Sequence, residues 1–326
     1  MVGHGAAAPP VPERRLGSTD VLLVAAERLE ARPLGAYWRT DQLQTQSYVV
    51  KVPTGSDAIS GATTETFRWT AVRKGGGDLF SLRDLPAGPL TAADKAAWRR
   101  AGAPASFRVW SNDHYAAYRT GRPGPWTADG PQAGAGGRWP FTGFEKNGKM
   151  VRTPCPGSSG GTGCEKPVGY GATLEDLQAV DTRPEALLKR YTDATPFPVT
   201  DAQRLLRVSG DLADAPIPPR LQAAILRMIP SLPGVTRIEG VTDPLGRTGF
   251  ALAAERGGEG EARQPYGSRT ELMFALDGTY LGDRDVLTRP AGIYRSQQPG
   301  FVIRTWIVRS AGWSDTEPAP PAATAY

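Results

Sequence analysis

Hydrophobic and polar residues alternate with a period of two along three stretches in the last third of the chain. The positions that share a face are Thr248, Phe250, Leu252 and Ala254, then Leu272, Phe274 and Leu276, then Phe301, Ile303, Thr305 and Ile307. This period is that of a β-strand with one face on a core and the other toward solvent, which is typical of antiparallel sheets. Asp277-Gly278 lies between two strands and is a strong signal for a tight turn.

A helical period dominates the middle of the chain and recurs near its start. Residues 219–229 carry one apolar stripe, made of Leu221, Ala224, Ile225, Met228 and Ile229. Further helices are predicted after the N-capping residues Thr19, Thr91, Thr173, Thr182 and Thr200. The last two of these threonines are followed three residues later by Glu185 and Gln203, which is the spacing of a capping box.

Two more strands are predicted from Tyr37 to Val50 and from Glu65 to Arg73, because both runs are rich in Tyr, Trp, Thr and Val. Strands, then helices, then strands again predict an α+β fold, with a curved antiparallel sheet or unclosed barrel and helices packed on one face. We expect a single domain over residues 18–313. A disordered Pro/Ala-rich leader at 1–17 precedes it, and a similar tail at 314–326 follows.

Glycine and proline crowd residues 120–172, which predicts a long excursion from the body of the domain. Its aromatic residues are Trp126, Trp139, Phe141 and Phe144. Aromatic side chains in such a loop can form a surface for a protein partner, or they can pin the loop to the body as a lid. Both interpretations stay open. The aromatic residues elsewhere, Trp110 and Tyr115 among them, are expected in the core.

Composition excludes two classes of protein. The 326 residues are 40% hydrophobic and 22% charged, as in ordinary globular domains. The net charge of +5 comes from 38 basic and 33 acidic residues that are interspersed, so no nucleic-acid groove is expected. No run of 18 apolar residues occurs, so this chain has no predicted transmembrane segment.

The stretch CPGSSGGTGC, residues 155–164, has the most chemical character. Ser159 as a nucleophile needs a strand before it, a helix after it and a histidine base, and the chain has no histidine after His114. A phosphate loop would end in Gly-Lys-Ser/Thr, which is missing here. A disulfide between Cys155 and Cys164 fits best, because small flexible residues let the two sulfurs meet. Free buried thiols are the alternative.

Other candidates for catalysis or metal binding are weak. His4 lies in the leader and His114 is isolated, so a zinc site is not predicted. Asp283 and Asp285 sit near a predicted turn, where a solvated turn is favoured over a Ca²⁺ site. The carboxylate pairs that proximity offers are Glu175 with Asp176 and Asp211 with Asp214. All of them lie in capping or loop contexts, so no catalytic residue, metal or cofactor is predicted.

Several segments together resemble a family. They are GPLTAADKAAWRRAGAPASF, TRPEALLKRY, PPRLQAAILRMIPSLPGVTRIEGVTDPLGRTGFAL and ELMFALDGTYLGDRDVL, in that order. The chain is similar over residues 20–313 to an uncharacterised actinobacterial family of membrane-anchored proteins often encoded beside extracytoplasmic-function sigma factors. The family implies an N-terminal cytoplasmic tail and one transmembrane helix, both missing from this chain. The order of elements also resembles periplasmic lipoprotein carriers and sigma-regulator sensor domains.

These observations predict a non-enzymatic, extracytoplasmic binding or sensor domain of a membrane-anchored envelope protein. Its partner would be a lipid-like ligand or another envelope protein in sigma-factor-linked regulation. A carboxylate-dependent hydrolase acting on an envelope substrate, and a purely structural module, are the alternatives. For a carrier, we expect an apolar cavity under the helices. The residues predicted to line this cavity are Leu221, Ile225, Phe250, Phe274 and Ile303.

Overall fold

The structure of the protein, a computed structural model, describes ten stretches of the chain. They are residues 18–51, 57–73, 75–111, 114–129, 149–153, 164–168, 174–193, 200–213, 216–256 and 265–319. The predicted leader at 1–17 and the end of the tail, 320–326, lie outside these residues. Within the described part, no helix is long and apolar enough to cross a membrane.

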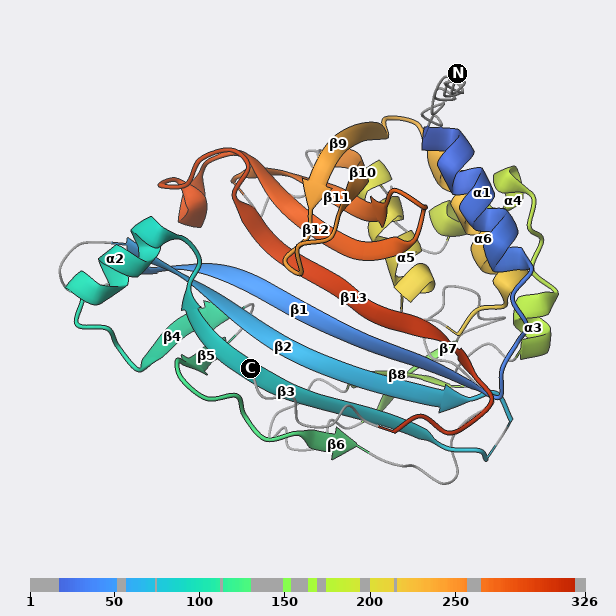
Figure 1. Ribbon diagram of the computed structural model, residues 1–326, viewed down its shortest axis with the longest axis horizontal. Helices are drawn as coiled ribbons and strands as arrows, with labels where there is room; N and C mark the ends of the chain where they lie inside the picture. Colours follow the sequence, from blue (N-terminus) through green and yellow to red (C-terminus); the bar gives the residue numbers. More distant parts are fainter. Residues whose placement is uncertain are drawn as a thin grey trace, which may run out of the picture.

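One antiparallel sheet forms the frame of the molecule (Figure 1), and nine of the described strands belong to it. Their order across the sheet is β6-β3-β2-β1-β13-β12-β11-β10-β9, and the sheet is open, with β6 and β9 at its edges. The strands are β1 (Tyr37–Lys51), β2 (Asp57–Ala71), β3 (Asp78–Pro89), β6 (Thr127–Asp129), β9 (Thr236–Thr242), β10 (Thr248–Arg256), β11 (Gly267–Ala275), β12 (Tyr280–Arg289) and β13 (Val302–Ser314). The first long strand therefore pairs with the last one, in the middle of the sheet.

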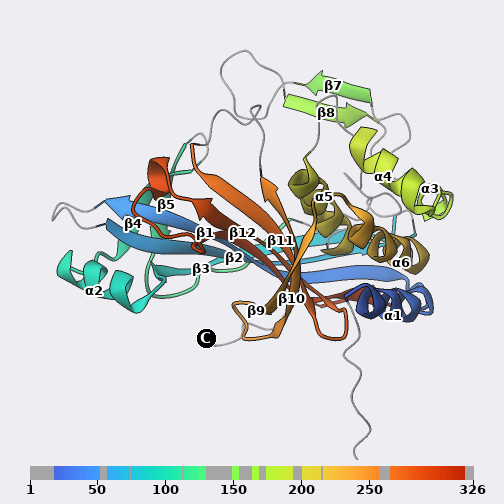
Figure 2. The ribbon, with the colours of Figure 1, turned by 90° about the horizontal axis from the view of Figure 1, so that it is seen from above.

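Helices gather over the half of the sheet formed by the later strands (Figures 1 and 2). The helices are α1 (Ser18–Glu30), α2 (Ala92–Arg100), α3 (Leu174–Gln178), α4 (Pro184–Asp193), α5 (Asp201–Ala213) and α6 (Pro219–Met228), with 3-10 turns η1 (Ile229–Ser231) and η2 (Gly292–Tyr294). Helix α5 packs directly on β10, β11 and β12, while α6 packs on α1 and α4. Helix α2 packs separately on β2 and β3. The predicted α+β class, with an antiparallel sheet and helices on one face, is confirmed.

Local capping signals set several helix starts. The side chains of Thr91 and Asp94 each accept a backbone N–H from the other's residue, which completes a capping box at α2. Thr200 and Gln203 do the same at α5. These bonds satisfy N–H groups that the first turn of a helix leaves without partners.

The main core lies between the helices and one face of β10 and β11. Its members include Leu22 of α1, Ile225 of α6, and the stacked rings of Phe250 and Phe274. The other face of the same strands is also buried, and a second cluster there contains Met273 and Ile307. The expectation that these strands turn one face to solvent is therefore wrong, since both faces carry a core. Leu276, expected on the core face, lies just beyond β11 and is largely exposed.

Two small antiparallel pairs stand apart from the large sheet. They are β4 (Ser106–Ser111) with β5 (His114–Arg119), and β7 (Lys149–Thr153) with β8 (Cys164–Val168). The β4–β5 hairpin is fixed to the body by Tyr118, whose ring stacks on Tyr48 of β1. The predicted excursion at 120–172 thus contains the edge strand β6 and the β7–β8 pair, and most of its other residues lie outside the described part.

Candidate functional site

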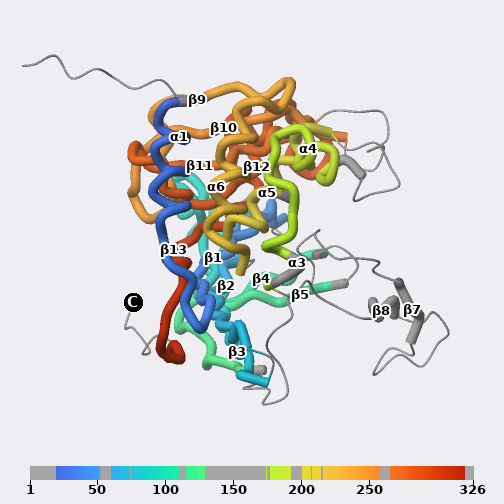
Figure 3. Tube along the Cα trace, turned by 90° about the vertical axis from the view of Figure 1, so that its right-hand side faces the viewer, coloured from blue at the N-terminus to red at the C-terminus, as the bar shows by residue number. Residues whose placement is uncertain are grey.

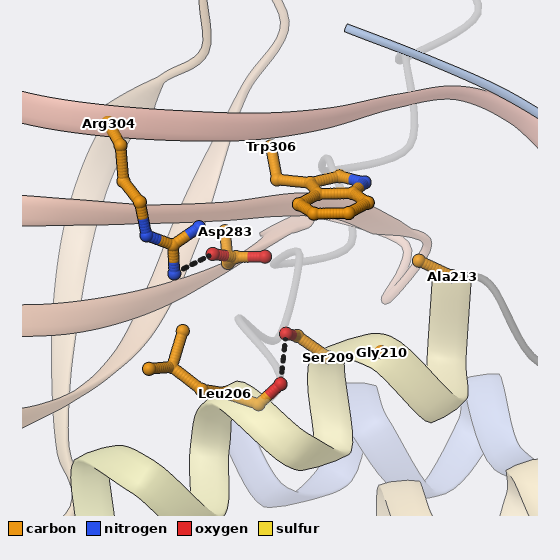
Figure 4. Close-up of a pocket in the computed structure, with 7 residues that line it drawn as sticks. All are labelled: Leu206, Ser209, Gly210, Ala213, Asp283, Arg304 and Trp306. Atoms are coloured by element: carbon orange, nitrogen blue, oxygen red, sulfur yellow. Dashed lines mark hydrogen bonds and ion pairs between the residues drawn. The ribbon is translucent and has the colours of Figure 1, made fainter. Parts of the chain in front are cut away.

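A small cavity of about 150 Å³ lies between helix α5 and the sheet. Four of its lining residues, Leu206, Ser209, Gly210 and Ala213, recur at helical spacing on one side of α5. The sheet contributes Asp283 from β12 and Arg304 and Trp306 from β13. Figure 4 shows these three side chains extending from the sheet toward α5.

Strand register explains why the three sheet residues meet. Asp283 on β12 is paired with Trp306 on β13, and Asp285 is paired with Arg304. Directly paired residues on neighbouring strands point to the same face, so all four side chains lie on the helix-covered face. Leu272 of the main core is paired with Asp283 on the other side of β12. The cavity therefore begins where the apolar core ends.

Asp283 is the buried charge of the cavity, with only 4% of the residue exposed. Its Oδ1 lies 2.9 Å from Arg304 Nη2 in an ion pair (Figure 4). On the other side, Tyr280 Oη donates to Asp283 Oδ2 over 3.5 Å. An ionised carboxylate accepts about four hydrogen bonds. Asp283 thus keeps acceptor capacity beside open space.

Arg304 links this carboxylate to a second one. Its Nε donates to Asp285 Oδ2 at 2.8 Å, and Thr270 Oγ1 donates to Asp285 Oδ1 at 2.8 Å. Arg256 Nη1 lies 3.4 Å from Asp285 Oδ2. Asp285 is therefore held by three partners, whereas Asp283 shares one arginine with it. The two aspartates and two arginines balance in charge.

The electrostatics of the site follow from this burial. Desolvation raises the pKa of Asp283 to about 6, and the charge of Asp285 adds to the rise, while Arg304 and Ser209 oppose it. For Arg304, desolvation lowers the pKa, but the carboxylates of Asp283 and Asp285 outweigh it and the net shift is upward. Asp283 therefore exchanges its proton near neutrality, and Arg304 stays charged.

Helix α5 is built to leave the space open. A Cβ placed on Gly210 would meet no atom within 4 Å, so the missing side chain is part of the cavity. The neighbouring Ser209 turns its Oγ back to the carbonyl oxygen of Leu206, at 2.6 Å. Glycine inside a helix costs about 1 kcal/mol relative to alanine. The sequence carries this cost at a position of α5 that lines the cavity.

The five residues predicted to line a ligand cavity do not line the cavity between α5 and the sheet. Leu221, Ile225, Phe250 and Phe274 are fully buried and pack together in the main core. Ile303 belongs to another cluster, with Tyr294 and Leu287, on the opposite face of the sheet. Its neighbour Arg304 faces the helices, and adjacent strand residues point to opposite faces. The prediction that these five residues line one cavity is therefore wrong.

The predicted partner surface is partly tested. Trp126 packs against the cluster of Phe67, Trp69 and Leu79, and the Arg83 guanidinium lies 4.8 Å from the centre of its ring. Trp126 is thus a packing residue. The other three residues of the predicted surface, Trp139, Phe141 and Phe144, lie outside the described residues.

The predicted disulfide stays a prediction. Cys155 and Ser159 lie outside the described part of the chain, and so does the side chain of Cys164. Of the carboxylate pairs, the side chains of Glu175 and Asp176 and all of Asp214 also lie outside it. Asp211 is buried and accepts a hydrogen bond from Tyr191 Oη at 2.6 Å, which ties α5 to α4.

The solvated-turn interpretation of Asp283 and Asp285 is wrong, because both lie inside β12 and are buried. Sequence reasoning missed them although a signal existed. In the run LGDRDV, Asp283 and Asp285 are two residues apart and so share one face of a strand, and the run follows the tight turn after β11. Among the described residues, no group of three or more His, Cys, Asp or Glu side chains could hold a metal ion.

The fold and the site define a class: an α+β protein with a small polar cavity between one helix and an open antiparallel sheet. Comparison with protein-family models, with curated proteins and with solved structures gives no match for this chain. The resemblance to the sigma-factor-linked membrane-anchored family therefore stays a prediction, and the function is argued from the site.

Proposed function

We propose that this protein is a non-enzymatic binding and sensor domain whose ligand occupies the cavity between α5, β12 and β13. One observation supports this above the others. Asp283 is almost completely buried, yet it borders the cavity, and its arginine partner Arg304 is shared with Asp285. A desolvated charge beside an unfilled cavity is costly for stability, and such groups concentrate at functional sites.

The cavity limits the size and the chemistry of the ligand. Its volume of about 150 Å³ is close to that of an engineered cavity that binds benzene. Leu206 and Trp306 offer apolar contacts, and Asp283 offers an acceptor. The ligand is therefore a small molecule with an apolar part and an N–H or O–H donor for Asp283. Pockets for larger ligands span roughly 300–1,000 Å³, so the cavity favours this ligand over a lipid-like one.

The cellular setting is part of the same proposal. The family resemblance supports an extracytoplasmic domain of a membrane-anchored envelope protein, with regulation linked to a sigma factor. A ligand in the cavity would touch α5, which packs on three strands and joins the helices to the sheet. Alkylation of the unreduced protein, followed by mass measurement, tests whether the protein comes from an oxidising compartment. A Cys155–Cys164 disulfide has no free thiol, so neither cysteine would be alkylated. Two alkylated thiols would argue against an oxidising compartment.

Binding can be tested with two variants that place the same leucine side chain at two different glycines. Gly210→Leu fills the cavity, whereas Gly312→Leu adds the same side chain on β13 at another glycine whose Cβ would meet no atom within 4 Å. A thermal-shift screen with small amines, amidines, amides and alcohols should find probes that stabilise the wild type and Gly312→Leu. The same probes should leave Gly210→Leu and Asp283→Asn unshifted. Equal shifts in Gly210→Leu and the wild type would place the binding elsewhere.

A carboxylate-dependent hydrolase is the second candidate, favoured by the raised pKa of Asp283. A general acid or base works best with a pKa near the operating pH. Against it, Arg304 bridges Asp283 and Asp285 and so separates the only nearby carboxylate from Asp283 among the described residues. If the wild type hydrolyses chromogenic ester or glycoside substrates and Asp283→Asn does not, the protein is a hydrolase.

A further inference from the structure

The β4–β5 hairpin has one inner and one outer face, set by strict alternation. Phe107 and Val109 point inward and are buried, while Arg108 and Trp110 point outward and are exposed. The paired strand follows the same rule, and its exposed residues are Tyr115, Ala117 and Arg119. In Figure 3 the hairpin extends away from the strands β1 to β3. The described residues of its outer face are therefore exposed.

Two large aromatic rings occupy this outer face. Trp110 is 57% exposed and Tyr115 is 58% exposed, and they are directly paired across the strands. Their ring centroids lie 5.0 Å apart at an interplanar angle of 80°. The Arg108 guanidinium sits 4.6 Å from the centre of the Tyr115 ring. Exposed aromatic clusters of this kind usually mark an interaction site, because leaving them in water is unfavourable.

Aromatic and cationic residues follow one another along the outer face of the hairpin. The Trp110–Tyr115 pair is next to the Ser111–His114 pair that ends the ladder. Arg108 follows two residues further from that end, and Arg119 lies two more residues away, opposite Ser106. With a rise of about 3.4 Å per residue, the Cα atoms of the two arginines lie roughly 7 and 14 Å along the hairpin from the aromatic pair. The described outer-face residues include both arginines and no acidic side chain.

We propose that the outer face of the β4–β5 hairpin docks on an anionic lipid membrane. Trp and Tyr rings settle at the boundary between headgroups and acyl chains, and interfacial groups enter it by about 5–10 Å. Arg108 and Arg119 lie on the same face as the rings and can reach the lipid phosphates, which guanidinium groups bind through paired hydrogen bonds. A sugar polymer is less suited, because stacking on it requires a flat platform and these two rings stand almost perpendicular. This surface is separate from the Asp283 cavity and does not depend on it.

Vesicle flotation tests the proposal with the full chain. Wild-type protein should bind vesicles of phosphatidylcholine mixed with phosphatidylglycerol, and bind pure phosphatidylcholine much more weakly. The Trp110→Ala/Tyr115→Ala double variant should partition at least about tenfold less, because two interfacial anchors are lost. Arg108→Ala and Arg119→Ala should each reduce binding about fivefold at low salt. Ile293→Ala and Arg295→Glu alter other exposed residues and serve as matched controls with unchanged binding.

Quenching by brominated acyl chains measures depth independently. The wild type should lose tryptophan fluorescence on brominated vesicles, and Trp110→Phe should bind normally but lose most of that quenching. Near-ultraviolet circular dichroism verifies that each variant is folded. Equal binding to both vesicle types, or normal binding by the folded double variant, would overturn the proposal. So would a wild type that ignores vesicles but binds an anionic polysaccharide through Trp110 and Tyr115.

Discussion

Two arginine–carboxylate clusters sit on opposite faces of the sheet and differ in what lies beside them. On one face, Glu65 accepts from Arg83 Nε at 2.5 Å and also from Arg309, which donates to Asp41 at 2.9 Å. The Trp126 ring covers Arg83, so this cluster is packed. On the other face, Asp283, Asp285 and Arg304 border the cavity beneath α5.

The Glu65 cluster has the surroundings of charges that stabilise the fold, whereas the Asp283 cluster has those of charges that can bind a ligand. Glu65 has two arginine partners and lies under packed side chains, so its contacts are complete. Asp283 is equally buried, but it has one arginine, which is shared, and faces unfilled space. The same residue types thus have different consequences, and the surroundings decide which. The predictions below test that distinction.

The largest effect is expected at the packed cluster. Glu65→Gln leaves Arg83 and Arg309 facing a neutral group in a buried site, so the free energy of unfolding should fall by about 3–5 kcal/mol. Urea denaturation at neutral pH measures this loss. Glu239→Gln removes a surface ion pair to Arg237 and should cost less than about 1 kcal/mol. A loss at Glu65 no larger than at Glu239 would mean that the packed cluster contributes little.

At the cavity we expect the opposite sign: at neutral pH, removing the charge of Asp283 should raise the free energy of unfolding. The pKa of Asp283 is about 6 in the folded protein against 3.8 for the free group, so the folded state holds the proton more tightly. The stability of the wild type therefore falls as pH rises between these values, and it levels off above pH 6. At 1.36 kcal/mol per pKa unit, the fall is on the order of 3 kcal/mol.

Asp283→Asn should remove this fall, because asparagine does not titrate. Relative to the wild type, the variant should gain on the order of 3 kcal/mol between about pH 4 and pH 7. Chemical denaturation across this range measures both curves, and a carboxyl titration by NMR gives the pKa of Asp283 directly. Parallel curves would show that the cavity does not raise that pKa.

The next largest effect on stability is expected at Trp126, whose ring covers Arg83 of the packed cluster. Trp126→Ala removes a half-buried ring from Phe67, Trp69 and Arg83, and should lower the free energy of unfolding by about 2 kcal/mol. Trp110→Ala removes an exposed ring and should change it by less than about 0.5 kcal/mol. Thermal unfolding of the two variants compares them. A larger effect at Trp110 would reverse the assignment of which tryptophan packs.

The smallest effect is a gain at the cavity wall. Gly210→Ala adds a methyl group to open space and a better helix former, so stability should rise by about 1 kcal/mol. Gly249→Ala is the opposite case, since a Cβ there would collide with the Phe274 carbonyl oxygen. The two melting temperatures should shift in opposite directions. A loss at Gly210 would mean that the space beside it is not available.

Sequence patterns predicted what depends on neighbours in the chain. The N-cap at Thr91, the capping box at Thr200, the apolar stripe of α6, and the turn at Asp277-Gly278 are confirmed, because each is decided within a few residues. Strand β3 was missed, since its mixed sequence DLFSLRDLPAGP shows no clear period and contains prolines.

The candidate site was missed for a different reason. Asp283 and Arg304 meet only because β12 pairs with β13 in one register, which no local pattern specifies. The aromatic residues were misplaced in the same way. Trp110 has the composition of a core strand but faces outward, while Trp126 follows a glycine-rich run and is packed. Which face of an element finds a partner is a property of the assembled sheet.

The pairing of β1 with β13 has a consequence for how the chain reaches its native state. Strands β2, β3 and β6 extend from one side of that pair and β12 to β9 from the other, so the join is made by β13, which comes after all other strands of this sheet in the sequence. Contacts of such long sequence separation form slowly. Until β13 pairs with both neighbours, β1 and β12 each have an unpaired edge, and unpaired strand edges promote aggregation during synthesis. Deleting residues 302–314 would cut the sheet in two at its centre.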